Sequence, residues 1–178
     1  GGPLSNPTFL VTYVATPDGV YSPKYGRLVR YNGGTPTVSG RTFITDITGA
    51  WNTSEKAALV WYGAKFIVSS PVIINGVLQP TVNHFDMQGN VSARVSIGNG
   101  TTVENPRGLA CSTNGICLSV GFSEGTPFGI TNSVVYARRF DANTLSPLGI
   151  IFYLDDHTAW MEDPDVVFNT KTGKEQFF

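Results

Sequence analysis

A weak internal repeat of about 56 residues is the feature that most constrains how this chain can fold. One series of equivalent positions, Val29, Phe85 and Phe140, has spacings of 56 and 55 residues. A second series has spacings of 57, 51 and 60 residues and places an apolar run after a turn each time, at Phe9, Phe66, Cys117 and Phe177. Two series with one period are hard to obtain by chance. A period of this length, made of strand-like pieces, predicts blades or stacked β units.

The composition agrees with an all-β protein. The 178 residues include 20 Gly and 11 Pro, with many Thr, Ser, Asn, Val and Ile, as in short strands joined by tight turns. No segment shows the apolar spacing of a helix over three turns. We therefore expect β-propeller-type blades of four antiparallel strands in a single repeat domain of about three blade equivalents. The expected units are 1–50, 51–104, 105–160 and a partial unit, 161–178.

The charge balance bears on possible partners and location. Twelve Lys and Arg face 13 Asp and Glu, and only 14% of residues are charged, against about 25% in an average soluble domain. No strong field would attract nucleic acid, and no apolar run approaches the roughly 20 residues of a spanning helix. We therefore expect neither nucleic-acid binding nor membrane insertion. A surface rich in Thr, Ser and Asn is common outside the cell, which favours an extracellular or cell-surface location.

The two cysteines lie on either side of a turn-rich segment. Cys111 and Cys117 end and begin apolar runs, so they can face each other across a hairpin. A disulfide there would indicate an oxidising compartment. Two reduced, half-buried thiols are the alternative.

The two ends of the sequence hold complementary parts of one unit. The first unit lacks its first strand, whereas the last unit has a first strand without the later ones. We expect assembly by pairing between the two ends, within a ring or between copies of the chain, through Phe9, Leu10 and Val11 on one side and Val166, Val167 and Phe168 on the other. Propellers have about four to eight blades. Two chains in a six-bladed ring, an open array and a piece of a longer repeat protein are the alternatives.

Several segments resemble a loosely defined family of secreted prokaryotic β-propeller-like repeats. Its units read roughly PDVAYN, TGEYLVVW, IYGRRFDA and G.PLG. Residues 163–169 and 172–177, and then 135–142 and 147–149, carry the likeness. The second unit departs from it at 82–85, where His84 stands in place of arginine. The resemblance implies an architecture and no particular activity, since such blades occur in adhesins, surface proteins, lectins and enzyme accessory modules.

An acidic segment at 155–165 suggests a cation. It contains five carboxylates, Asp155, Asp156, Glu162, Asp163 and Asp165. Calcium takes about six to eight oxygen ligands, so a calcium site is one interpretation. The spacing is not that of an EF-hand, and a solvated acidic loop is the alternative. Calcium is the only cofactor that the sequence suggests.

Two tryptophans occupy equivalent loops. Trp51 and Trp160 precede the first strands of their units at similar distances. Aromatic rings at repeated loop positions can stack on sugars, so both are candidate glycan-binding residues. Filling the gap between blades is the alternative. The corresponding loop at 99–105 has no aromatic residue, and Trp61, Tyr62, Phe9, Phe66 and Phe177 are expected in the core.

Motifs for catalysis are lacking. The chain has two histidines, His84 and His157, and none of the nucleophile, phosphate-binding or metalloprotease motifs. Adjacent Asp155 and Asp156 do not establish a glycosidase pair. We therefore predict no enzymatic activity and an extracellular structural or adhesive module that assembles by strand complementation. The alternative is a carbohydrate-binding, lectin-like propeller that uses its loop face.

Overall fold

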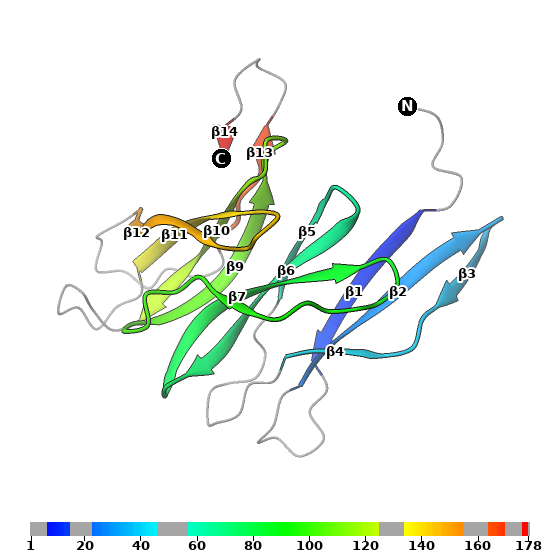
Figure 1. Cartoon of the computed structure of the whole chain (residues 1–178), viewed down its shortest axis with the longest axis horizontal. Coiled ribbons are helices and arrows are strands. Elements are labelled where there is room, and N and C mark those ends of the chain that lie inside the picture. Colours follow the sequence, from blue (N-terminus) through cyan, green and yellow to red (C-terminus); the bar gives the residue numbers. More distant parts are fainter. Residues whose placement is uncertain are drawn as a thin grey trace.

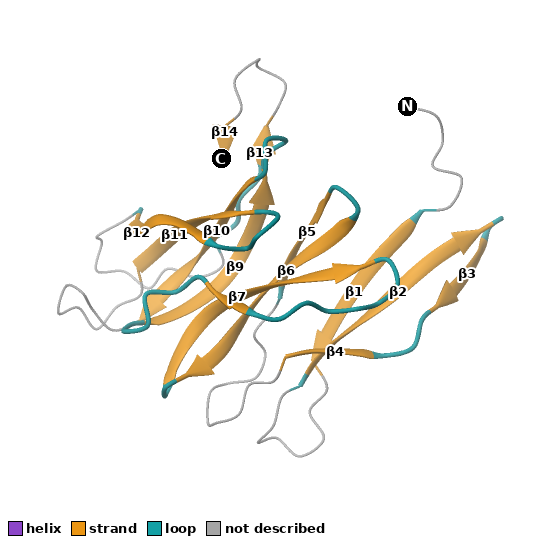
Figure 2. Cartoon of the chain, viewed as in Figure 1, coloured by secondary structure: helices purple, strands orange, loops and turns teal. Residues whose placement is uncertain are grey.

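The structure is a computed structural model that describes residues 7–14, 23–45, 57–124, 134–154, 164–169 and 176–177. Within these ranges every regular element is a β-strand, so no helix capable of crossing a membrane is found there. Figure 1 shows the sheets following one another along the chain, and Figure 2 shows the strands and loops. The all-β, propeller-type prediction is confirmed.

The strands form three four-stranded antiparallel sheets and one two-stranded sheet. The first sheet contains β1 (Thr8–Val14), β2 (Lys24–Asn32), β3 (Thr35–Val38) and β4 (Thr42–Thr45). In it, β3 and β4 pair with different parts of β2. The second sheet contains β5 (Ala58–Tyr62), β6 (Lys65–Ile74), β7 (Val77–Asp86) and β8 (Val95–Ser96). The third sheet contains β9 (Val103–Cys111), β10 (Ile116–Glu124), β11 (Val134–Asp141) and β12 (Pro147–Tyr153), and the two-stranded sheet contains β13 (Phe168–Asn169) and β14 (Gln176–Phe177).

The longest hairpin shows how local sequence determines strand pairing. Strands β6 and β7 are joined by Asn75 and Gly76, whose φ angles are 52° and 81°. A two-residue turn with both φ angles positive matches the right-handed twist of the flanking strands, and Asn-Gly tolerates these angles best. The turn places Ile74 opposite Val77 and fixes the register of the whole pair.

Apolar side chains between the sheets hold them together. On β6, Phe66 and Val68 face the first sheet, whereas Ile67 faces the third, because successive side chains of a strand point to opposite faces. The interface of the first and second sheets contains buried Leu10, Leu28, Ile44, Phe66, Val68 and Phe85. Each fully buried side chain of this size contributes about 1.5–3 kcal/mol to the free energy of folding.

The other two interfaces repeat this arrangement. Between the second and third sheets lie Ala58, Ile67, Val82, Ile97, Leu109, Cys117, Phe140, Ala142 and Leu145. On the far face of the third sheet, buried Val166 packs with Phe168 and Phe177 against Ala110, Leu118, Val120 and Ala137. Each sheet thus packs against the next one in the chain, as blades do in a propeller.

The second series of repeated positions marks structurally equivalent strand pairs. Phe66 is opposite Trp61, with ring centroids 4.8 Å apart, and Phe177 is opposite Phe168, with centroids 5.1 Å apart. At the same position of the third sheet, Cys111 and Cys117 form a disulfide, as predicted. The repeat therefore reflects a cross-strand contact that recurs in the first hairpin of each unit: β5–β6, β9–β10 and β13–β14.

Pairing between the two ends is not seen within one chain. Strand β13 pairs with β14, and β1 pairs with β2, so the described residues contain no ladder between Val166–Phe168 and Phe9–Val11. Among the described residues, the last unit thus pairs its first strand with its own second strand. Pairing between the two ends, within a ring or between copies, stays a prediction.

The core assignment needs two corrections. Phe66 is buried as expected, but Trp61 is 47% exposed and Phe9 is 52% exposed. Both side chains lie beside the β1 edge of the first sheet, where no described strand covers them. The apolar character of Trp61 and Phe9 did not indicate that this edge of the sheet is uncovered.

Candidate functional site

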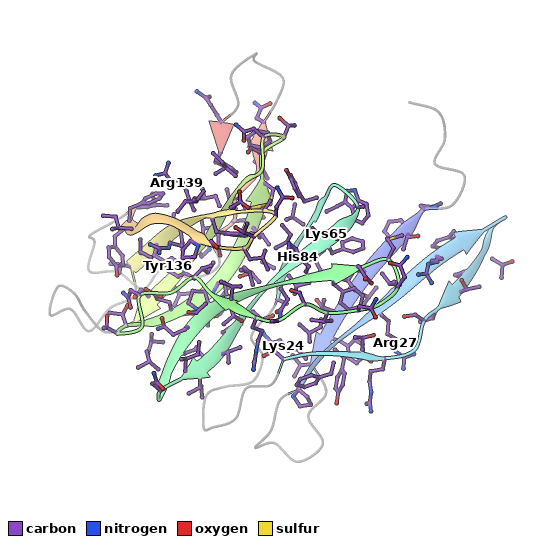
Figure 3. All side chains as sticks on the ribbon, in the orientation of Figure 1. Lys24, Arg27, Lys65, His84, Tyr136 and Arg139 are labelled. Atoms are coloured by element: carbon purple, nitrogen blue, oxygen red, sulfur yellow. A yellow bond between two sulfur atoms is a disulfide. The ribbon has the colours of Figure 1, made fainter. Side chains whose placement is uncertain are left out.

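A pocket of about 400 Å³ opens where the second sheet connects to the third. Its lining comes from three elements: the β8–β9 connection, β11 and β12. The lining residues are Asn99, Thr101, Thr102, Arg138, Gly149, Ile150, Ile151 and Tyr153. Alternation along β11 turns Arg138 towards the pocket and leaves Arg139 exposed on the other face of the third sheet, where Figure 3 labels it.

The β8–β9 connection is folded around the side chain of Asn99. Its Oδ1 accepts hydrogen bonds from the backbone N–H groups of Thr101 (2.8 Å) and Thr102 (3.0 Å). Its Nδ2 donates to Oγ1 of Thr102 at 2.7 Å and to the hydroxyl of Tyr153 at 3.4 Å. An asparagine that bonds to the backbone two residues ahead forms a turn of its own. Asn99 thus joins the connection to β12.

Two buried side chains support this turn from below. The carboxylate of Glu104 accepts hydrogen bonds from the Asn99 N–H (3.1 Å) and from Oγ1 of Thr102 (3.2 Å). Gln79 on β7 accepts from the Gly100 N–H and donates to the Thr102 carbonyl, both at 2.6 Å. Glu104 and Gln79 have no exposed surface. The turn is therefore held by both sheets.

Gly98 is needed for this close approach. A Cβ atom at position 98 would collide with Oε1 of Gln79 and would lie 2.6 Å from Oε2 of Glu104. Only a residue without a side chain lets the two polar groups reach the turn.

Burial dominates the electrostatics of the cluster. It raises the pKa of Glu104 to about 7, against the opposing effects of the Asn99 N–H, the Thr102 hydroxyl and Arg138. Burial also lowers the pKa of Arg138, and Glu104 opposes that shift. Tyr136, labelled in Figure 3, is fully buried, and its pKa is raised by burial and by Glu104. Near neutral pH, Glu104 thus exists as a mixture of its protonated and ionised forms.

The pocket offers hydrogen bonding together with an aromatic ring. Nε of Arg138 is buried, and no described residue accepts a hydrogen bond from it. The Arg138 side chain as a whole is half-buried and lines the pocket, so its guanidinium can donate hydrogen bonds to a ligand there. Tyr153 is half-buried and contributes a ring, while Thr101 and Asn99 contribute polar groups. A polyhydroxylated ligand fits this combination, because hydroxyls both donate and accept and C–H faces stack on rings.

Most of the glycan-binding and calcium-binding residues predicted from the sequence lie outside the described residues. These are Trp51, Trp160, Asp155, Asp156, Glu162 and Asp163. Asp165 is described, and its Oδ1 accepts from the Val166 N–H at 2.8 Å. The described residues contain no group of three or more potential metal ligands. The calcium site therefore stays a prediction.

A second pocket, of about 540 Å³, lies at the turns of the second and third sheets. It is lined by Trp61, Tyr62, Gly63, Cys111, Ser112, Thr113 and Asn143. The sequence assigned Trp61 to the core and therefore missed this surface. For the pocket at Asn99, the Asn-Gly-Thr-Thr sequence is a readable turn signal, but its proximity to Arg138 and Tyr153 was not predictable from the sequence.

The sheet order and the stacking of sheets define this chain as β-propeller-like. No protein-family model and no curated protein sequence match it. Among solved structures, it is similar to the α-L-arabinanase of Penicillium chrysogenum complexed with arabinobiose, with 16% sequence identity and a TM-score of 0.66. The alignment covers 93% of this chain and 51% of the arabinanase chain. At this identity the likeness shows the fold, and the chain spans about half the length of that enzyme.

This comparison corrects the prediction that the chain is not an enzyme, because the matching fold is that of a glycoside hydrolase. The prediction relied on the absence of short linear motifs. Glycosidases need only two carboxylates at a suitable distance, and these come from separate parts of the chain. A search for linear motifs does not detect such a pair. The disulfide, for its part, is consistent with a secreted protein.

Proposed function

We propose that this chain is the saccharide-binding part of a carbohydrate-active β-propeller, and that the pocket formed by Asn99, Arg138 and Tyr153 holds the sugar. One observation carries the proposal: an aromatic ring, Tyr153, and a half-buried guanidinium, Arg138, line the same open pocket. Its volume of about 400 Å³ lies within the usual range of ligand sites.

The pocket residues have distinct roles in this proposal. The ring of Tyr153 stacks on the apolar C–H face of a sugar, while Arg138 donates to sugar hydroxyls. Asn99 holds the Tyr153 hydroxyl and so orients the ring. Because Glu104 and Gln79 already fix the turn, binding costs little conformational ordering.

The likeness to an arabinanase solved with arabinobiose supports a carbohydrate ligand and suggests which sugars to test first. Calorimetric titration with arabinobiose and longer arabino-oligosaccharides is the direct experiment, preceded by a glycan array to include other sugars. We expect Tyr153→Ala and Arg138→Ala each to weaken binding at least tenfold, which corresponds to about 1.4 kcal/mol. Tyr31→Ala is the matched control, since Tyr31 is an exposed tyrosine of the first sheet.

Two results would contradict the location of the site. Unchanged affinity in both Tyr153→Ala and Arg138→Ala would show that the sugar does not bind in this pocket. Loss of binding in Trp61→Ala alone would place the sugar in the second pocket. Melting temperatures of all variants show whether a loss of binding reflects unfolding.

Stacking by Trp51 and Trp160 is the second candidate, proposed from their equivalent loop positions. The same titration with Trp51→Ala and Trp160→Ala tests it. Loss of sugar binding at an unchanged melting temperature would support it, and loss of both together would indicate a structural role.

A further inference from the structure

We propose that the free edge of β1, with the apolar pocket beside it, is an acceptor site for an added β-strand. The occupant is an extended polypeptide segment of the same repeat type as β5 and β9, with an aromatic residue opposite Phe9. This inference is independent of sugar binding and concerns the first sheet, away from the pocket between the second and third sheets.

Among the described residues, no strand of the first sheet occupies the position that β5 and β9 occupy in the next two sheets. In the second sheet β5 pairs with β6, and in the third β9 pairs with β10. Phe9 of β1 belongs to the same repeat series as Phe66 of β6 and Cys117 of β10. Strand β1 is therefore the counterpart of β6 and β10, yet no described strand pairs with its other edge.

The backbone of β1 is directed to receive such a strand. The Tyr31 N–H donates to the carbonyl of Pro7 at 3.1 Å, so Pro7 directs its backbone groups towards β2. In an antiparallel ladder this orientation alternates. The N–H and C=O groups of Thr8, Leu10, Thr12 and Val14 therefore point to the free edge. An open row of such groups is a template for a further strand.

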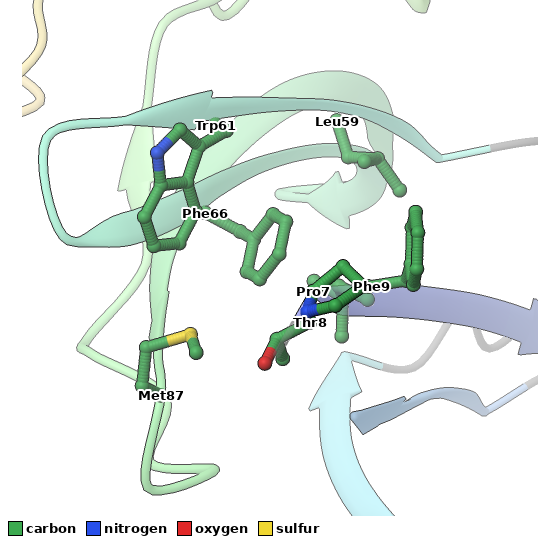
Figure 4. A pocket seen from close by; sticks show the side chains of 8 residues that line it. Pro7, Thr8, Phe9, Leu59, Trp61, Phe66 and Met87 are labelled. Carbon is green, nitrogen blue, oxygen red and sulfur yellow. The ribbon is translucent and has the colours of Figure 1, made fainter. Parts of the chain in front are cut away.

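An apolar pocket of about 480 Å³ adjoins this edge, and Figure 4 shows its lining. The lining residues are Pro7, Thr8, Phe9, Leu10, Leu59, Trp61, Phe66 and Met87. Leu59 and Trp61 lie on the face of β5 towards the first sheet and are 38% and 47% exposed. On the other face of β5, Ala58 and Val60 pack in the core between the second and third sheets, together with Leu109 of β9. A strand added to β1 would cover Leu59 and Trp61 in the same way.

The recurring cross-strand contact defines the chemistry of the occupant. Three first hairpins join equivalent residues: Trp61 with Phe66, Cys111 with Cys117, and Phe168 with Phe177. Phe9 occupies the matching position of β1 but is 52% exposed. The missing strand should therefore place an aromatic residue across from Phe9. Residues 163–169 of this chain, with Phe168 in that position, are a model for such a segment.

The test uses a labelled, end-capped peptide of residues 163–169 and the full chain. Fluorescence anisotropy should show saturable binding, and hydrogen exchange at the amides of Leu10 and Thr12 should slow when the peptide is added. Thr12→Pro removes an edge-facing N–H without removing a bond to β2, so it should weaken binding at least tenfold. Thr12→Val retains the N–H group and serves as the matched control.

A second pair of substitutions protects the test against misfolding of the proline variant. Phe9→Ser in the chain and a serine in place of Phe168 in the peptide should each weaken binding. Absence of binding at millimolar peptide, or equal binding to Thr12→Pro and Thr12→Val, would overturn the proposal.

A second copy of the chain could also supply such a strand. The solution mass measured by light scattering shows whether copies associate. Self-association that the peptide or Thr12→Pro abolishes would support the acceptor site, with a neighbouring copy as the donor. Self-association that neither one changes, combined with no effect on the Leu10 and Thr12 amides, would contradict it.

Discussion

The backbone N–H of Asn99 donates a hydrogen bond to Oε2 of Glu104 at 3.1 Å, so a buried carboxyl group at the start of β9 holds the turn that forms one wall of the pocket. Glu104 does not line the pocket itself. It acts through Asn99, which in turn contacts Tyr153, and is therefore a positioning residue.

The raised pKa of Glu104 predicts that stability falls as pH rises. The pKa is 4.5 for an ordinary glutamate and about 7 in the folded chain, so between these values the folded state holds the proton more tightly. The free energy of unfolding should decrease across this window, by at most about 3 kcal/mol, and should change little from this group above it. Urea unfolding at a series of pH values between 4.5 and 8 measures the effect.

Glu104→Gln is the control for this pH dependence. Glutamine keeps the oxygen acceptor but does not titrate, so the decrease between pH 4.5 and 7 should disappear. Burial lowers the pKa of His84, so the stability that the neutral His84 contributes is lost as pH falls. That trend has the opposite sign and should persist in the variant. A decrease of the same size in Glu104→Gln would refute the assignment.

Gly98→Ala should disrupt the turn. The added methyl group would collide with Gln79 and Glu104, so we expect a loss of about 1–3 kcal/mol in unfolding free energy and weaker sugar binding. Gly40→Ala is the matched control, because a Cβ atom there meets no atom within 4 Å. Equal stabilities of the two variants in urea unfolding would show that the turn adjusts without cost.

Reduction of the disulfide should lower stability moderately. Cys111 and Cys117 are six residues apart, and closing such a short loop contributes about 2 kcal/mol in the chain-entropy description. Thermal unfolding with and without a phosphine reductant measures the change. The double variant Cys111→Ala/Cys117→Ala should not respond to the reductant, and a comparable response from it would assign the effect to something other than the disulfide.

The interface between the first two sheets should depend strongly on Phe85. Its side chain is fully buried, and a Cβ atom on Gly26 would lie only 2.7 Å from the ring. Phe85→Ala should cost about 3–5 kcal/mol of unfolding free energy because it leaves a cavity. Phe43→Ala removes an equal side chain that is 47% exposed, and it should cost clearly less. Similar losses would mean that burial of Phe85 between the sheets contributes no more than the exposed Phe43 ring.

The architecture was predictable because its causes are local. Alternation along each strand and the turn residues between strands recur with the repeat, and equivalent positions such as Phe66 and Cys117 occupy equivalent places. The disulfide followed from the same logic, since Cys111 and Cys117 flank one hairpin turn.

The candidate pocket was less predictable because its walls come from distant parts of the chain. Asn99 and Tyr153 are 54 residues apart and meet only when the third sheet folds against the second. Trp61 was assigned to the core by its apolar character, but it is 47% exposed in the pocket beside β1, and only the packing of the first two sheets determines those surroundings.

The position of a bound saccharide tests the central claim most directly. We would crystallise the chain with arabinobiose, or with the best ligand from the glycan array, and locate the sugar in the electron density. The account predicts a sugar ring against Tyr153 with its hydroxyls accepting from Arg138. A sugar bound only at Trp61 and Tyr62, or at any other surface, would contradict it.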